Sequence, residues 1–65
     1  MNNFIEVHSI DMGKPVLINL SHVEEIIPDN DGVTIYFAFT PPEYSEQDYI
    51  HAEESYDKIK LLIWR

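Results

Sequence analysis

The sequence lacks cysteine entirely and has only two glycines among its 65 residues. Without cysteine, neither a disulfide nor a zinc site built on thiolates can stabilise the fold. With so little glycine, no glycine-rich loop is available to hold a phosphate group. We therefore expect the chain to depend on a compact hydrophobic core, on a partner subunit, or on both.

Basic residues are also scarce, because four lysines and arginines stand against twelve aspartates and glutamates. The formal net charge is −8. A surface of this sign repels phosphate backbones and anionic lipid headgroups, so we expect neither direct nucleic-acid binding nor membrane binding. The acidity either keeps a small protein soluble or faces a basic partner.

Long apolar runs are missing as well. No stretch approaches the roughly 20 apolar residues that span a bilayer. Residues 1–6 lack the basic start and apolar middle of a signal peptide. The absence of cysteine fits a reducing compartment, and we therefore expect a cytoplasmic protein.

The length limits the chain to a single domain, residues 1–65, and its 45% hydrophobic content is that of a folded protein. A domain of this size buries only about 60% of the surface that its unfolded chain exposes, so its stability is marginal. Association of copies is a common supplement at this size. We expect a homo-oligomer, with a dimer as the first choice, and another protein is the alternative partner.

The longest uncharged, strand-forming stretch is residues 32–39. Every second residue of this stretch is large and apolar, which predicts a strand with one buried face: Val33, Ile35, Phe37 and Phe39. The opposite face, formed by Thr34, Tyr36 and Ala38, carries no charge either. Because an exposed sheet face is usually polar, we expect this second face to be partly covered or available to a partner.

Period-two patterns predict further strands at 4–10, 15–20, 25–28 and 49–53. The sequence of residues 29–32, Asp-Asn-Asp-Gly, predicts a hairpin loop of about four residues. Ser21 followed by Glu24 has the form of a capping box, so a helical turn is expected at 21–24. Residues 40–48, with two prolines, read as a surface loop.

The last ten residues carry an amphipathic pattern. Ser55 can cap a helix whose apolar stripe holds Tyr56, Ile59, Leu62 and Ile63. So short a helix does not persist alone and must dock on the sheet. The expected fold class is therefore α+β: a mainly antiparallel sheet of four or five strands with one C-terminal helix packed on one face.

Candidate catalytic chemistry is sparse. His8, His22 and His51 lack the close spacing that metal sites usually show. Ser9 and Ser21 each adjoin a histidine in the sequence, but neighbouring residues on a strand point to opposite faces. Adjacent glutamate pairs at 24–25 and 53–54 are more typical of solvated surface than of an acid and base pair. We expect no catalytic residue, no metal, no cofactor and no enzyme activity.

Aromatic residues are the better candidates for a site, since tyrosine and tryptophan dominate contact energies at protein interfaces. Most of them are expected in the core. The candidates for an interface are those on the uncharged second face, near the proline-containing loop and at the chain end: Tyr36, Ala38, Tyr44, Tyr49 and Trp64.

The order of motifs resembles a known group of proteins. Gly-x-Pro-Val-x-Ile-Asn at 13–19 is followed by a short turn at 21–23, two strands, and Glu-Ser-Tyr-Asp-x-Ile-x-x-Leu-Ile at 54–63. This arrangement resembles the small FlbD-like proteins associated with bacterial flagellar gene clusters and, more distantly, the β-rich LytTR-type DNA-binding domains. The resemblance implies the same fold and a non-enzymatic role. The loop at 40–48 departs from it, and the basic loops of LytTR-type domains are missing.

Two functional hypotheses follow. The first is a small non-enzymatic protein-interaction module that self-associates and has a regulatory role. The alternative is an acidic inhibitor or nucleic-acid mimic that occupies a basic protein, which predicts one contiguous acidic patch. A small hydrolase or metal-binding protein is a third hypothesis and requires converging histidines.

Overall fold

The computed structural model describes residues 3–40, 42 and 47–64. In this part of the chain, five strands form one antiparallel sheet: β1 (Phe4–Ser9), β2 (Lys14–Asn19), β3 (Val23–Asp29), β4 (Gly32–Phe37) and β5 (Tyr49–Ala52). A 3-10 turn, η1 (Leu20–His22), joins β2 to β3, and one helix, α1 (Tyr56–Ile63), follows β5. The expected α+β fold with a C-terminal helix is confirmed.

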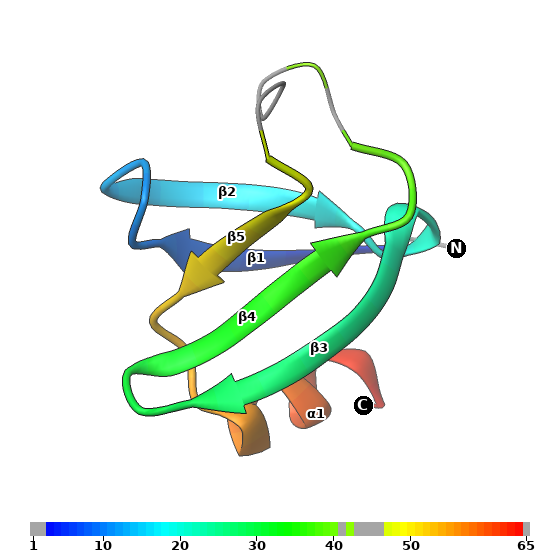
Figure 1. Ribbon diagram of the computed structural model, residues 1–65. Coiled ribbons are helices and arrows are strands. Elements are labelled where there is room, and N and C mark those ends of the chain that lie inside the picture. The colour runs from blue at the N-terminus through cyan, green and yellow to red at the C-terminus, as the bar shows by residue number, and fades with distance from the viewer. Residues whose placement is uncertain (1–2, 41, 43–46, 65) are drawn as a thin grey trace.

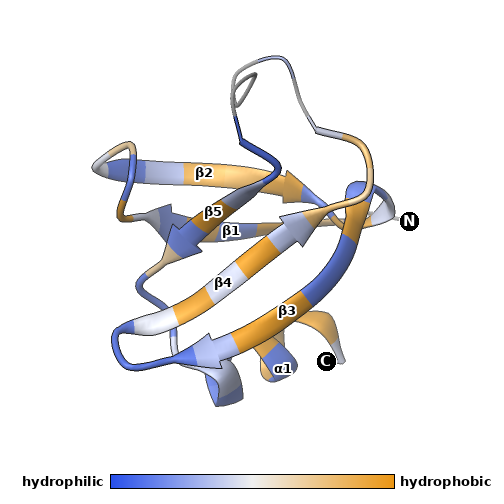
Figure 2. Ribbon diagram, in the orientation of Figure 1, coloured by the Kyte–Doolittle hydropathy of each residue, from blue (hydrophilic) through white to orange (hydrophobic). Residues whose placement is uncertain are grey.

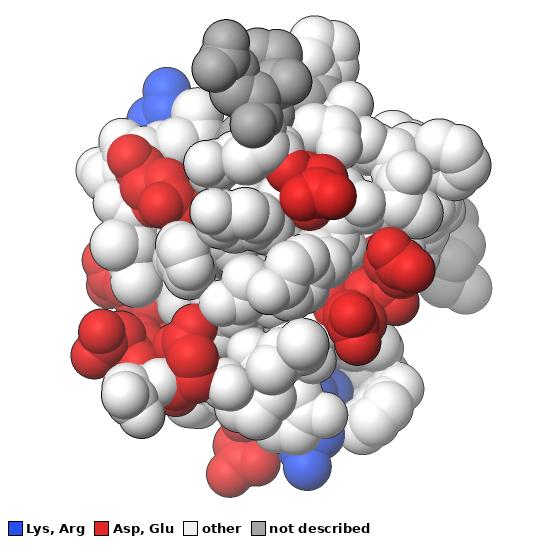
Figure 3. All heavy atoms as spheres, in the orientation of Figure 1, with Lys and Arg blue, Asp and Glu red and all other residues white. Residues whose placement is uncertain are grey.

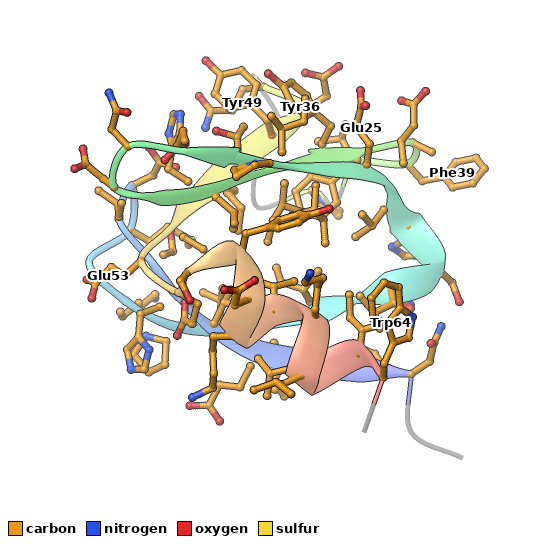
Figure 4. The ribbon with its side chains drawn as sticks, turned by 90° about the horizontal axis from the view of Figure 1, so that it is seen from below. Glu25, Tyr36, Phe39, Tyr49, Glu53 and Trp64 are labelled. Atoms are coloured by element: carbon orange, nitrogen blue, oxygen red, sulfur yellow. The ribbon has the colours of Figure 1, made fainter. Side chains whose placement is uncertain are left out.

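The strand order is β2-β1-β5-β4-β3, so the last strand in the sequence lies in the middle of the sheet. Strand β5 pairs with β1 on one side and with β4 on the other, and so joins the hairpin β1–β2 to the hairpin β3–β4 (Figure 1). The sheet curls so that the two hairpins face one another across the core, and α1 closes the open side between them (Figure 4). The curl gives the sheet an inner face toward α1 and an outer face away from it.

The core occupies the inner face. Its buried side chains come from β1, β2, β4, β5 and α1: Ile5, Val7, Ile18, Val33, Ile35, Phe37, Ile50, Ala52 and Ile59. The alternation that predicted them is visible as hydrophobic and hydrophilic bands along β3 and β4 (Figure 2). The period-two pattern of residues 32–39 therefore identified the inward residues of β4 up to Phe37.

Both edge strands contain a proline. Pro15 lies in β2 and Pro28 in β3, and these are the two strands with a neighbour on one side only. Proline has no N–H to donate, so it is tolerated at an edge and discourages pairing with a strand of another molecule. Association of this protein through extension of its sheet is therefore disfavoured.

The β3–β4 hairpin is tighter than expected. Asp29 pairs directly with Gly32, which leaves a two-residue turn at Asn30–Asp31 where a loop of about four residues was predicted. The Asp29 carboxylate accepts a hydrogen bond from the backbone N–H of Asp31 at 3.0 Å, which fixes the turn. Gly32 has φ +144°, and a Cβ there would overlap the carbonyl oxygen of Ala52 in β5. Glycine is required because β5 crosses close to this backbone.

The expected capping box at Ser21 and Glu24 does not form. The turn is η1, one residue earlier, and its cap is Asn19, whose side-chain oxygen accepts a hydrogen bond from the Ser21 N–H at 2.9 Å. Glu24 already belongs to β3, at an irregularity of the β3–β4 register between Val23 and Glu25. The Asn19 side chain therefore caps the turn in place of the Ser21 side chain.

The prediction that Phe39 shares the buried face was wrong, because β4 ends at Phe37 and the Phe39 side chain is 68% exposed. The N–H groups of Ala38 and Phe39 both donate to the carbonyl oxygen of His22, at 2.8 and 3.4 Å. These bonds hold residues 38 and 39 against η1, and the period-two alternation stops at the end of β4. The Phe39 ring instead meets the His22 ring edge-on at 6.1 Å.

The C-terminal helix agrees with the sequence pattern. The Ser55 hydroxyl accepts a hydrogen bond from the Lys58 N–H at 3.1 Å, and Asp57 lies in the first turn, where a negative charge is favourable. Ile59 is fully buried, and Leu62 and Ile63 pack partly against the core. No helix among the described residues is long and apolar enough to cross a bilayer.

Candidate functional site

The candidate site is the outer face of β3, β4 and β5, on the side of the sheet away from α1. The strand register places residues of the three strands in two rows across this face. One row is Glu25, Tyr36 and Tyr49, and the next is Ile27, Thr34 and His51. Together with Asp29 and Asp11 at its margin, we call this set the tyrosine face.

The aromatic rings of the tyrosine face form a continuous line. The rings of Tyr36 and Tyr49 lie 5.8 Å apart and tilted by 52°, and Tyr49 meets His51 in a T-shaped arrangement at 5.4 Å. These distances are typical of favourable aromatic contacts. Figure 4 shows Tyr36, Tyr49 and Glu25 pointing together away from the helix. Tyr36, Tyr49 and His51 are all half-buried, so each ring leaves part of its surface open to solvent.

Thr34 forms the floor between these rings. Its side chain is buried, and its hydroxyl donates a hydrogen bond to the Asp29 carboxylate at 2.8 Å. This bond, with the one from the Asp31 N–H, lowers the pKa of Asp29 below its ordinary value. Asp29 is therefore ionised at neutral pH and held at one end of the tyrosine face.

Asp11 holds a second charge beside the same face, from the turn between β1 and β2. Partial burial raises its pKa, but hydrogen bonds from the His51 backbone N–H at 2.7 Å and from the His51 ring outweigh burial, so the net pKa is lowered. The carboxylate ties the β1–β2 turn to β5. It also places a negative charge next to the aromatic line.

Positive charge is absent from this region of the sequence. No lysine or arginine occurs between Lys14 and Lys58, a span that includes β3, β4 and β5 in full. On the face seen in Figure 3, acidic atoms lie in separate groups around an uncharged middle, and basic atoms appear only at the margins. The tyrosine face is therefore an aromatic surface with a carboxylate border and no balancing cation of its own.

A related pairing joins β1 to β5 outside the tyrosine face. Glu54 accepts hydrogen bonds from the His8 backbone N–H at 2.9 Å and from its ring at 2.7 Å. The bond to Glu54 raises the pKa of His8 above its ordinary value. Burial raises the Glu54 pKa, but the hydrogen bonds from His8 outweigh it and lower the pKa overall. This pair stabilises the sheet rather than forming a site.

The residues predicted as interface candidates do not all meet. Tyr36 and Tyr49 lie together on the tyrosine face. Ala38 is exposed just beyond the end of β4. Trp64 is 75% exposed and lies apart from them, at the end of α1 (Figure 4). Tyr44 lies outside the described residues.

Sequence reasoning missed five members of this face: Glu25, Ile27, Asp29, His51 and Asp11. The His8 ring contacts Glu54, and the His51 ring contacts Asp11. The signal was not in local spacing, since Asp11 and His51 are 40 residues apart and meet only because β5 inserts beside β1. Among the described residues, no three histidine or acidic side chains converge in a way that would hold a metal ion.

The chain was compared with known proteins at the level of sequence and of structure. The resemblance to FlbD-like and LytTR-type proteins is not tested by these comparisons and stays a prediction. Protein-family models, curated proteins and solved structures give no match to this chain.

Proposed function

We propose that this protein is a non-enzymatic protein-interaction module that binds a basic segment of another protein on its tyrosine face. The observation that carries the proposal is the line of three half-buried rings, Tyr36, Tyr49 and His51, bordered by carboxylates on strands that hold no lysine or arginine. Half-buried tyrosines are preordered by their neighbours, so little side-chain entropy is lost when a partner covers them.

The chemistry of the face favours arginine or lysine in the partner. A guanidinium or ammonium group is attracted to the face of an aromatic ring and can pair at the same time with a nearby carboxylate. Glu25 lies directly opposite Tyr36 in the register, so one cationic side chain can reach both groups. Arginine suits this arrangement best, because its planar group both stacks and forms paired hydrogen bonds.

The distribution of acids favours this mixed surface over a mimic of nucleic acid. A mimic would present one contiguous acidic patch in place of a phosphate backbone. In Figure 3 the acidic atoms instead lie in separate groups with uncharged surface between them. On this face, an acidic inhibitor would make its contact through the aromatic line rather than through charge alone.

The test is isothermal titration of the protein with an arginine-rich peptide of about ten residues. We expect Glu25→Lys to weaken binding about tenfold, or about 1.4 kcal/mol, and Tyr49→Ser to weaken it by at least as much. The matched control is Glu6→Lys, since Glu6 is an exposed acid of β1 outside the tyrosine face. The control makes the same change in net charge.

Equal weakening by Glu25→Lys and Glu6→Lys would refute the proposal, because it would reduce the binding to attraction by net charge. A peptide that binds Tyr49→Ser as tightly as the unmodified protein would refute it too. Action in the cytoplasm and a regulatory role remain predictions from the sequence and belong to the same proposal.

A further inference from the structure

A second surface lies on the other side of β3, where the edge strand and α1 leave a groove of about 340 Å³. Its walls are largely apolar: Leu20, Val23, Ile26, Tyr56, Ile59 and Ile63. Trp64 lines one end and leaves three quarters of its surface in solvent. A tryptophan exposed beside an unfilled apolar groove on a small chain is typical of an interaction surface.

The charges at this groove differ from those of the tyrosine face. Glu24 and Glu25 line it on the β3 side, and Lys60 lines it on the helix side. Lys60 approaches Asp57 of its own helix at 3.7 Å and lies 5.4 Å from the centre of the Tyr56 ring. Both partners of Lys60 are thus exposed residues of its own helix, and its contact with either is weak. The groove therefore has one acidic wall and one basic wall.

We infer that the groove is the contact surface for a second copy of this chain, arranged about a two-fold axis. In such an arrangement each surface meets itself, so the acidic wall of one copy faces the basic wall of the other. Lys60 of one copy pairs with Glu24 of the partner subunit, and the reverse pair forms at the same time. Trp64 of each copy fills the apolar part of the other groove.

Several features favour a second copy as the occupant. Each copy carries a formal charge of −8, so two copies repel unless they meet where bases lie, and Lys58 and Lys60 are both on α1. A basic partner would find its complement on the β3 wall only, whereas a second copy is complementary to both walls. The edge strands, blunted by Pro15 and Pro28, offer no competing route through sheet extension.

The inference concerns a different face of the molecule, which shares only Glu25 with the tyrosine face. The variants that test it leave Glu25 unchanged, so its failure and the failure of the proposed function are distinguishable. It is tested by sedimentation equilibrium across a concentration range from about 1 to 500 μM. We expect the unmodified chain to dimerise in this range and Trp64→Ser to weaken the dimer at least tenfold. Leu61→Ser is the matched control, because Leu61 is an equally exposed apolar residue of α1 that does not line the groove.

A charge exchange separates this arrangement from general stickiness. Lys60→Glu and Glu24→Lys should each weaken the dimer, because each places like charges across the two-fold axis. The double variant should restore it to within about threefold of the unmodified chain. Circular dichroism melting of each variant shows that the fold is retained.

Three results would overturn the inference: a strict monomer at 500 μM, equal loss from Trp64→Ser and Leu61→Ser, or a double variant no better than the single ones. If Trp64→Ser lowers the melting temperature strongly, the charge exchange still decides the question. Peptide binding on the tyrosine face is unaffected by either result.

Discussion

At the scale of single residues, the structure depends on a few positions where no other side chain fits. Gly32 is the clearest, because its backbone is at positive φ and β5 passes directly over it. Gly13 also has positive φ, at +69°, but nothing lies within 4 Å of the position a Cβ would take. A side chain at Gly13 would therefore meet backbone strain only, whereas a side chain at Gly32 would meet both backbone strain and steric overlap.

This difference leads to a first prediction. Gly13→Ala should lower the free energy of unfolding by about 1 kcal/mol, the cost of a non-glycine residue at positive φ. Gly32→Ala should cost about 3 kcal/mol or more, because the β4–β5 pairing must move in addition. Urea denaturation followed by tryptophan fluorescence measures both. Equal effects at the two glycines would mean that β5 does not approach Gly32 closely.

Phe37 and Phe39 provide a second comparison between residues of the same type. Phe37 is buried at the end of β4, and Phe39 is exposed two residues later. We expect Phe37→Ala to cost about 3–5 kcal/mol in unfolding free energy and Phe39→Ala to cost less than about 1 kcal/mol. Thermal unfolding of both variants checks this, and a reversed order would contradict the observed end of β4.

At the scale of elements, the least extensive strand pairing is between β1 and β5, where only Ser9 and Ala52 are in register as strand partners. Carboxylates extend this short pairing on both sides. Glu54 takes the N–H of His8, and Asp11 takes the N–H of His51, in addition to the backbone bonds Ile10 to His51 and Glu53 to His8. Each carboxylate also contacts the ring of the same histidine.

This arrangement predicts a dependence of stability on pH. The raised pKa of His8 means that its pairing stabilises the fold fully below the ordinary histidine value of about 6.5 and is lost as the pH rises through the folded value. The lowered pKa values of Asp11 and Glu54 mean that their contributions are present above about pH 4.5 and are lost as the pH falls through their folded values. Stability should therefore be greatest between about pH 4.5 and 6.5.

The measurement is the urea midpoint from pH 3 to 9. Glu54→Gln retains a carbonyl oxygen for the His8 N–H and removes the charge, so it should flatten the decline above pH 6.5. Asp31→Asn serves as the control, because Asp31 is an exposed turn acid with no part in these pairs. An unchanged pH profile for Glu54→Gln would show that the His8 pair does not contribute.

The strands and the helix also show which features of the fold could be predicted from the sequence. Alternation identified the inward faces of the strands, and Ser55 and the stripe with Ile59 located the helix, because these signals lie within a few residues. The failures depend on contacts made across the chain. Phe39 left the strand because of the His22 carbonyl, and the capping box at Ser21 lost to Asn19.

The candidate site was predictable in part for the same reason. Tyr36 and Tyr49 were identified by residue type and strand face. Their contact required the order of strands, because β5 had to lie beside β4. The order also decides that Asp11 borders His51, and no local pattern indicates that order. Glu25 lies opposite Tyr36 because of the register of the β3–β4 hairpin.

At the scale of the whole molecule, charge divides the surface into two regions. The tyrosine face carries acids only, whereas the groove along α1 carries both signs. We therefore expect the two proposed associations to respond differently to salt. Between about 50 and 500 mM NaCl, binding of the arginine-rich peptide should weaken more than tenfold, since screening acts on its several exposed charge pairs. The affinity of the dimer should change only a few-fold, because its contact is mainly apolar. Screening of the repulsion between two acidic copies also opposes screening of the Lys60–Glu24 pairs.

The opposite order of salt dependence would contradict this division of roles. Isothermal titration gives the peptide affinity, and sedimentation equilibrium gives the dimer affinity in the same buffers. Glu6→Lys again controls for net charge in both measurements.

Binding of a basic segment to the tyrosine face can be located by following the amide signals of the isotope-labelled protein during titration with the arginine-rich peptide. We expect the shifts to concentrate on β3, β4 and β5 around Tyr36, Tyr49 and His51, and the groove residues near Trp64 to stay unchanged. Shifts spread evenly over all acidic residues, or centred on α1, would contradict it.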